Sequence, residues 1–315
     1  MANSNEKAVS RNIADIKVNV DAGHGSNTAG KRTAPFTKDV DIDGDGKVDV
    51  KKGKQYSEHY ANVMVANKLY NKLKSRGFGV HRTGWNDTNA KDDEDVTIAD
   101  RQKSVRNAKC DLSISCHFNA YGDGNSYNTA NGIGIYIHST KSNLIDSERF
   151  ANVLLNQLVK GTKQKNRGVN AGNFGMCNAK NMGVQGAVIV ELAFMTNEYE
   201  AQELMASEKY CEECAEELFK GVCDYYGVDY KKEIVEDKKV DSPSTQPTNQ
   251  SSNEYLVKVT ASALNIRKAA SMDAVVTGII RDKGVYTIVE TSKNGKWGKL
   301  KSGAGWISLS YTKKL

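Results

Sequence analysis

The chain has 315 residues, of which 39% are hydrophobic and 26% are charged. This balance is typical of a globular protein and excludes a fibrous or low-complexity chain. The length is sufficient for one α/β domain together with a small additional module. No apolar run approaches the roughly 20 residues that a membrane-spanning helix requires, so no membrane span is expected.

The amino-terminal residues 1–7 lack the apolar core of a secretory signal peptide. We therefore expect synthesis in the cytoplasm, with another route out of the cell if the protein acts outside it. Among the six cysteines, Cys211 and Cys214 form a C-x-x-C pair, but no second pair follows at zinc-finger spacing. We expect reduced thiols, several of them in the core, rather than a structural zinc site.

The positive charge is concentrated near the carboxyl end. The net charge is +6, and residues 254–315 contain 11 lysines and arginines against 4 acidic residues. Such a basic module favours an acidic partner, for example nucleic acid, anionic lipid or an anionic wall polymer. No nucleic-acid recognition motif accompanies the charge, so nucleic acid is not the expected partner.

The first predicted strand ends in a histidine between two glycines. Ile16, Val18 and Val20 alternate with polar residues, and Gly23-His24-Gly25 follows directly. Glycines on both sides allow a sharp turn, and ligands in open α/β sheets bind at the carboxyl ends of the strands. His24 is therefore a candidate metal ligand or general base; the alternative is an exposed histidine in a glycine-rich turn.

An acidic loop lies in the insertion that follows, between residues 26 and 54. Asp41, Asp43, Asp45 and Asp49 have the D-x-D-x-D-G-x-x-D spacing of the first nine positions of a calcium-binding loop. The twelfth position, which is a bidentate Glu in such loops, is Lys52. The loop is therefore either a calcium site or an acidic surface turn.

A helix is predicted over residues 58–76, followed by a strand over 78–83 and a second helix over 96–108. Glu58 opens the first helix, where the helix dipole alone favours a carboxylate; the functional alternative is a metal ligand beside His24. His59 follows Glu58 and competes for the same role. A further strand over 111–116 ends on His117, which repeats the pattern of a histidine at the carboxyl end of a strand.

The next predicted elements are a strand over 132–138, a helix over 147–160 and a strand over 186–194. His138 also ends a strand, but no glycine-rich turn frames it. The intervening stretch 166–183 is rich in Asn and Gly and is predicted to be a mobile loop near a binding cleft.

The strand over 186–194 contains one carboxylate, Glu191, among apolar residues. Because a buried polar group without a partner costs roughly 2–7 kcal/mol, Glu191 needs a partner. A salt bridge to Arg101 is one explanation, and a general acid or base with a raised pKa is the other and the favoured one. A long helix over 198–226 completes this part of the chain.

Residues 230–253 are predicted to be a flexible linker, since they are polar and hold two of the three prolines. Short β-type runs separated by turns follow from 254 to 315 and predict a small β-barrel of roughly six strands. Trp297, Trp306 and Tyr311 are expected either in its core or on a sugar-stacking surface. The predicted organisation is thus 1–229, a linker over 230–253, and 254–315.

Residues 16–226 resemble the zinc-dependent N-acetylmuramoyl-L-alanine amidases of the type 3 family. The resemblance rests on Glu58 at the start of a long helix and on the motifs DAGHG (21–25), ADR (99–101), SISCHFNA (113–120) and VELAFMTN (190–197). It implies a twisted, mostly parallel α/β sheet flanked by helices. It also implies zinc binding by His24, Glu58 and His117, catalysis by Glu191, and cleavage of the amide between the muramic acid lactyl group and L-alanine of peptidoglycan.

From the motif LNIR (264–267) to GWI (305–307), the tail resembles bacterial SH3-type domains, which bind peptidoglycan in related wall hydrolases. An amidase without a signal peptide that carries such a module is similar to phage endolysins, which reach the wall through a holin pore, and to autolysins. A zinc peptidase, a deacetylase or a non-catalytic wall-binding protein are the alternatives. His24, His117 and Glu58 match the ligand set of a catalytic zinc site whose fourth position is open. The sequence does not specify an oligomeric state.

Overall fold

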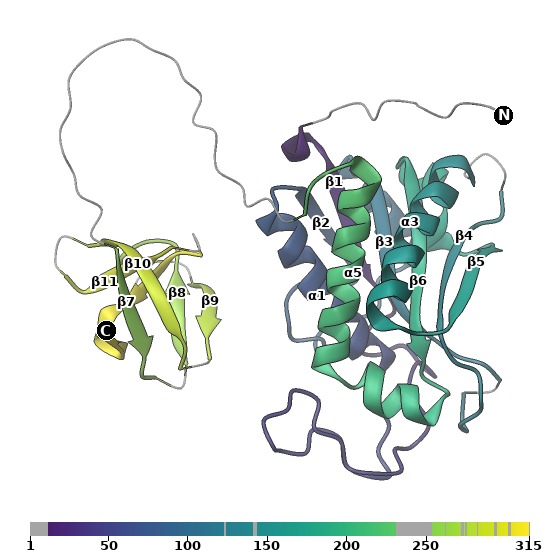
Figure 1. Ribbon diagram of the computed structural model, residues 1–315, viewed down its shortest axis with the longest axis horizontal. Coiled ribbons are helices and arrows are strands. Elements are labelled where there is room, and N and C mark those ends of the chain that lie inside the picture. Colours follow the sequence, from purple (N-terminus) through teal and green to yellow (C-terminus); the bar gives the residue numbers. More distant parts are fainter. Residues whose placement is uncertain are drawn as a thin grey trace. The chain divides into compact units, whose positions relative to one another are not determined.

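The computed structural model describes residues 12–122, 124–140, 144–230 and 254–314, except 262, 272, 273, 275, 282, 293, 294, 302 and 303. The chain divides into two compact units, Met1–Asp237 and Lys238–Leu315 (Figure 1). All but the first residue of the predicted linker 230–253 lie outside the described residues, so the linker stays a prediction. Within the described part, no helix is long and apolar enough to cross a membrane.

The N-terminal unit is built on a six-stranded sheet with the order β2-β1-β3-β6-β4-β5. All neighbouring strands are parallel except β4 and β6, which are antiparallel. This confirms the predicted mostly parallel α/β sheet. The strands are β1 (Lys17–Ala22), β2 (Gly79–Thr83), β3 (Leu112–Asn119), β4 (Ile133–His138), β5 (Asn166–Gly172) and β6 (Gly186–Phe194).

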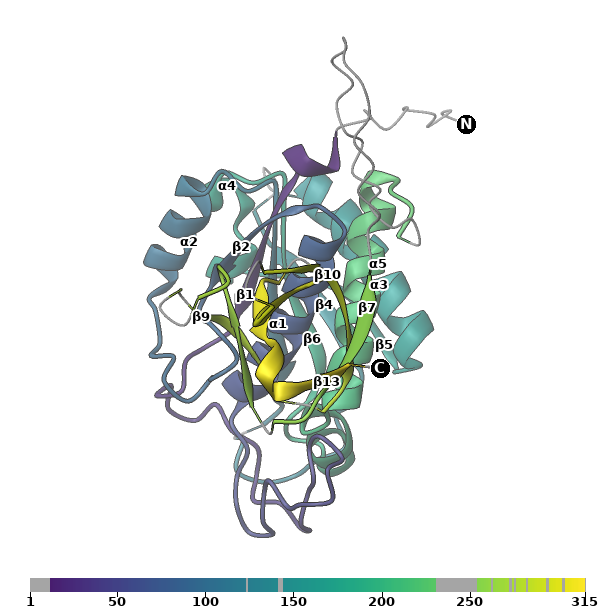
Figure 2. The same ribbon diagram turned by 90° about the vertical axis from the view of Figure 1, so that its left-hand side faces the viewer.

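Helices cover both faces of this sheet. On one face α1 (Glu58–Ser75), α3 (Leu144–Thr162) and α5 (Glu208–Tyr226) pack together, and on the other lie α2 (Ile98–Asn107) and the short α4 (Ala179–Met182) (Figures 1 and 2). Successive side chains of β6 point to opposite faces of the sheet and so contribute to two separate cores. Val188 and Val190 pack into the core beneath α1 and α5, whereas Ala187 and Ile189 pack with α2 and α4.

Two predicted elements differ from the structure. The stretch 166–183 is not a loop but contains β5, a 3-10 turn (η3, Gly175–Cys177) and α4. β5 pairs only with β4 at the edge of the sheet, and its polar, glycine-containing sequence carries no apolar alternation that would reveal a strand. The last predicted helix is divided into a π-helical segment (η4, Glu200–Met205) and α5, which begins after its N-cap Ser207.

The C-terminal unit is an antiparallel sheet of seven strands with the order β13-β7-β10-β11-β12-β8-β9. Its core consists of aliphatic side chains, among them Val257, Ile288 and Ile307. Trp297 is buried, whereas Tyr311 is 54% exposed. The strands are β7 (Tyr255–Val259), β8 (Leu264–Arg267), β9 (Val276–Ile280), β10 (Val285–Thr291), β11 (Trp297–Leu300), β12 (Trp306–Ser308) and β13 (Thr312–Lys314). The prediction of a small all-β module is confirmed.

Candidate metal centre

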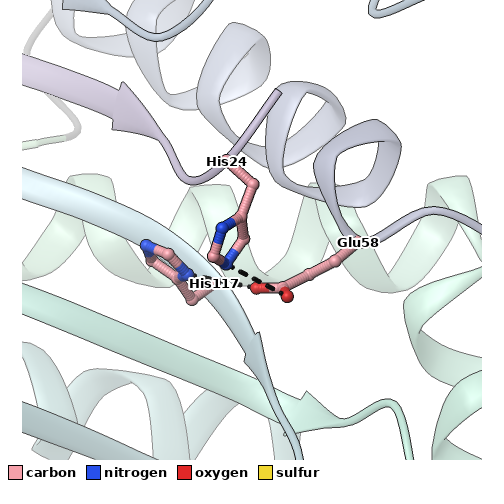
Figure 3. Close-up of side chains that lie close together, drawn as sticks. All are labelled: His24, Glu58 and His117. Carbon is pink, nitrogen blue, oxygen red and sulfur yellow. Dashed lines mark hydrogen bonds and ion pairs between the residues drawn. The ribbon is translucent and has the colours of Figure 1, made fainter. Parts of the chain in front are cut away.

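Three side chains from separate elements meet at the carboxyl ends of β1 and β3 (Figure 3). His24 Nε2 lies 3.2 Å from Glu58 Oε2, and His117 Nδ1 lies 3.1 Å from Glu58 Oε1. The two imidazole rings are perpendicular, with centroids 4.8 Å apart. One ligand atom from each residue lies within 4.8 Å of the other two. The structure therefore brings together His24, Glu58 and His117, as their sequence pattern predicts.

The glycines beside His24 are required by close packing. A Cβ atom built on Gly23 would lie 2.1 Å from His117 Cε1, and one on Gly25 would lie 2.3 Å from the backbone nitrogen of Asp95. His24 itself has a left-handed backbone with φ of 64°, a conformation that is uncommon outside glycine. The turn after β1 thus presses the backbone against the second histidine and turns the His24 side chain toward Glu58.

Glu58 is the first residue of α1, and its side chain is 2% exposed. Its backbone N–H donates to the carbonyl of Lys31 at 2.9 Å, while Oε1 accepts from the Phe118 N–H at 3.2 Å. Burial raises the pKa of Glu58, but hydrogen bonds and charges from His117 and His24 outweigh burial and hold the pKa below its usual range. Glu58 is therefore an anion between two histidines.

Glu191 lies beside this centre, because β6 places it directly opposite His117 in the parallel register. The residue is half-buried, and its Oε2 atom is buried without a hydrogen-bond partner. Burial raises the pKa of Glu191 to about 7; the positive charge of His117 opposes this shift and the negative charge of Glu58 adds to it. A carboxyl group with such a pKa can exchange protons near neutral pH.

The salt bridge between Glu191 and Arg101 that the sequence allows does not form. Arg101 instead pairs with Asp21 at 2.9 Å and with Asp95 at 3.0 Å. Glu191 Oε2 is instead buried without a hydrogen-bond partner, and burial raises the pKa of this carboxyl group. The role of Glu191 as a general acid or base stays a prediction.

His59 and His138 do not join the cluster. His59 is fully buried; its Nδ1 lies 2.9 Å from the Gly23 carbonyl and its Nε2 lies 3.3 Å from Asp93 Oδ2. It thus supports the turn before His24 rather than competing with Glu58. His138 Nδ1 accepts from the Thr140 N–H at 3.1 Å.

The acidic loop gathers part of its predicted ligand set. Carboxylate oxygens of Asp41, Asp43 and Asp49 lie within 4.8 Å of one another, and all three residues are exposed. Asp45 does not join them, because its carboxylate pairs with Lys47. The calcium prediction stays a prediction, with three of its four residues together.

A cleft of about 470 Å³ opens at the metal centre. His24, His117 and Arg101 line it on one side, and Val96, Ile98 and Met176 line it with apolar atoms. Val96 is 42% exposed and Ile98 is 48% exposed, although both are aliphatic. This apolar wall could not be predicted from the sequence, since exposed aliphatic residues at a helix start carry no distinctive pattern.

The three residues fit a catalytic zinc ion. Two imidazole nitrogens and one carboxylate oxygen are the ligand set of zinc sites that keep one position open. Two atoms bound tetrahedrally at about 2.1 Å lie about 3.4 Å apart, close to the 3.2 Å and 3.1 Å between Glu58 and the two histidine nitrogens. Glu58 Oε2 accepts no well-directed hydrogen bond although it is buried, as expected for an atom that binds a metal.

The fold of the N-terminal unit is similar to those of solved amidase structures. No curated protein sequence matches the chain significantly. Among solved structures, an N-acetylmuramoyl-L-alanine amidase from Clostridium difficile 630 is 25% identical with a TM-score of 0.51, covering 67% of this chain and 97% of its own. The amidase Ami1 from Mycobacterium smegmatis is 20% identical with a TM-score of 0.51, covering 69% of this chain and 99% of its own, and this likeness shows the fold alone.

A family profile described as N-acetylmuramoyl-L-alanine amidase matches residues 18–224. The matched range begins in β1 and ends in α5, so it contains His24, Glu58, His117 and Glu191. The chain therefore belongs to the N-acetylmuramoyl-L-alanine amidase family.

Proposed function

We propose that the N-terminal unit is a zinc-dependent amidase that cleaves the bond between the lactyl group of N-acetylmuramic acid and L-alanine in peptidoglycan. The observation that carries this proposal is the His24, Glu58 and His117 cluster with the unpaired carboxylate of Glu191 opposite His117. The identity of the cleaved bond rests on family membership, and metal-assisted hydrolysis rests on the side-chain cluster.

In this mechanism His24, Glu58 and His117 would hold the zinc ion. Zinc bound there would act as a Lewis acid and make the attacking water more acidic, with a pKa toward about 7. Glu191 accepts the proton of the attacking water and then donates it to the leaving amine of L-alanine. Burial, which raises the pKa of Glu191 in the metal-free protein, favours a carboxyl group that can both accept and donate a proton near neutral pH.

Digestion of purified peptidoglycan by the full chain tests the proposal. New L-alanine amino termini, lost with a chelator and restored by zinc, are the expected products. Metal-dependent cleavage with another end group would support the metal site but contradict the proposed bond. A new peptide amine on a residue other than the first alanine would indicate a peptidase, and released acetate would indicate a deacetylase. No cleavage of any wall preparation would place the protein among non-catalytic binding proteins.

We further propose that the C-terminal unit is an SH3-like module that binds the cell wall. Lys258 on β7 lies directly opposite Lys313 on β13, and both are exposed. Like charges that face each other across two strands repel, so this pair favours an anionic ligand such as a wall polymer. The double variant Lys258→Ala/Lys313→Ala should bind walls about two- to thirty-fold more weakly at low salt.

Lys301→Ala is the matched control, because Lys301 already pairs with Glu254 at 2.8 Å. Sedimentation of each full-length variant with insoluble walls measures the binding. Equal binding by the double variant and the wild type would remove this lysine pair from the wall-binding surface.

A further inference from the structure

A buried carboxylate, Asp21, is connected to His117 through one intervening residue, Ser115. Asp21 is fully buried in β1 and accepts from three donors. These are the Ser115 hydroxyl, the Thr83 hydroxyl at 2.8 Å and the Arg101 guanidinium at 2.9 Å. Because all three neighbours donate, Asp21 is an acceptor on both oxygens, and the Arg101 cation compensates its negative charge in the interior.

Ser115 connects this carboxylate to His117. The two residues lie on the same face of β3, two positions apart, and Ser115 Oγ lies 3.1 Å from His117 Nε2. The single hydroxyl proton of Ser115 is donated to Asp21, so its oxygen can only accept from the imidazole. The proton of a neutral His117 therefore resides on Nε2. In the metal-free protein a protonated His117 also donates from Nδ1 to Glu58 Oε1 at 3.1 Å. Zinc would replace that proton, so Nδ1 would face the metal while Nε2–H stays with Ser115.

Arg101 extends the same network to the other histidine. Its guanidinium donates to the carbonyl of Ala22 at 2.6 Å and to the carbonyl of His24 at 2.5 Å. Arg101 thus contacts the backbone on both sides of Gly23, and Asp21 accepts a hydrogen bond from Ser115, the neighbour of His117. One buried ion pair consequently holds both imidazole ligands in place.

We propose that Asp21 and Ser115 are positioning residues of the metal centre, which fix His117 in the tautomer that binds zinc through Nδ1. The proposal rests on the proposed function only in requiring that this cluster bind zinc. Hydrogen bonds from a ligating histidine to such outer partners set the ring orientation, and their loss costs roughly 10–100-fold in metal affinity.

Ser113 provides a matched control for Ser115. It is also fully buried on the same face of β3, two residues earlier, where its Oγ accepts from the Asn19 side chain at 3.0 Å. Ser113→Ala and Ser115→Ala each remove one buried hydroxyl from the same strand. Only Ser115 contacts a metal ligand, so the two variants separate a structural role from a role at the centre.

The test is competition for zinc between the full chain and a fluorescent chelator, with His117→Ala defining the zinc bound elsewhere. Ser115→Ala should raise the zinc dissociation constant about 10–100-fold, and Ser113→Ala should leave it within about twofold of the wild type. Equal dissociation constants for wild type and Ser115→Ala would overturn the positioning role. A wild type that binds no more zinc than His117→Ala would overturn the proposed function as well.

A second measurement does not depend on affinity. In zinc-loaded protein labelled with 15N-histidine, the imidazole shifts of His117 should show a protonated Nε2 and a metal-bound Nδ1. Ser115→Ala should broaden or shift the Nε2–H signal, while Ser113→Ala should not. A wild-type spectrum with the proton on Nδ1 would contradict the proposed tautomer directly.

Discussion

The described residues include two clusters of side chains that could bind a metal ion, and they differ in what surrounds them. At the metal centre, His24 comes from the turn after β1, Glu58 from the start of α1 and His117 from β3, and Glu58 is 2% exposed. In the acidic loop, Asp41 and Asp49 belong to one short exposed segment, and their carboxylates accept from backbone N–H groups of that same segment. The first cluster forms only when the whole domain is folded, whereas the second forms within a single turn.

This difference separates a functional assembly from a local one. A buried carboxylate such as Glu58 would be costly without compensation, and here two histidines provide it. The loop carboxylates remain in contact with water, so bringing them together costs little free energy. Their proximity is therefore weak evidence for a metal site. Substitutions at the two clusters should therefore have very different consequences.

Glu191→Gln should produce the largest effect. The amide keeps the shape of the side chain but cannot accept the proton of the attacking water, so turnover should fall about 10²–10⁴-fold while zinc binding is retained. Initial rates of peptidoglycan cleavage and metal content of the purified variant measure both quantities. Turnover within tenfold of the wild type would remove Glu191 from the role of base.

Glu58→Gln and Asp41→Asn compare the two clusters directly. Each variant removes one charge from a carboxylate group that could bind metal. Glu58→Gln should weaken zinc binding at least 100-fold, since a direct ligand contributes more than the 10–100-fold of an outer partner. Asp41→Asn should leave zinc binding unchanged, as titration with a competing chelator would show. Equal effects would mean that zinc does not discriminate between the clusters.

Residues that carry their own signal were predictable from the sequence. His24 and His117 each end an apolar strand, and Glu58 opens a helix, so parallel strand order brings them to one edge of the sheet. Strand alternation also places Ser115 on the same face as His117, so the contact between these two residues was predictable, although it is not among the predictions made from the sequence.

The remaining features depend on tertiary contacts. Arg101 could pair with Glu191 or with Asp21 on sequence grounds, and only the packing of α2 over β1 decides for Asp21. β5 lacks an apolar pattern because it lies at the sheet edge and needs no buried face. Lys31 influences both His24 and Glu191 electrostatically, but a lysine in a long insertion has no sequence signal for that position.

The raised pKa of Glu191 predicts a dependence of stability on pH in the metal-free protein. Its folded-state pKa of about 7 lies above the usual value of 4.5, so the folded state binds the proton more tightly than the unfolded state. The wild type should therefore lose stability relative to Glu191→Gln as pH rises from about 4.5 to 7. At about 1.4 kcal/mol per pKa unit, the rise from 4.5 to about 7 corresponds to a full difference of about 3 kcal/mol.

Urea unfolding of both metal-free proteins at pH 5 and pH 8 measures this difference. Glu213→Gln, an exposed change on α5, is the control and should show no such dependence. A difference between wild type and Glu191→Gln that is the same at both pH values would mean that burial does not perturb this carboxyl.

The acidic loop should give the smallest effect. With Lys52 in place of the last acidic ligand and with Asp45 paired to Lys47, we expect a calcium dissociation constant of about 1 mM or weaker. Calcium at 1 mM would then stabilise the fold by about 0.4 kcal/mol, which raises the thermal midpoint by about 1–2 °C. Asp41→Asn/Asp43→Asn should abolish this rise without lowering amidase activity, because the loop contributes no ligand to the zinc centre. An unchanged wild-type midpoint at 10 mM calcium would make the loop an acidic turn and leave the buried cluster as the one candidate metal site among the described residues.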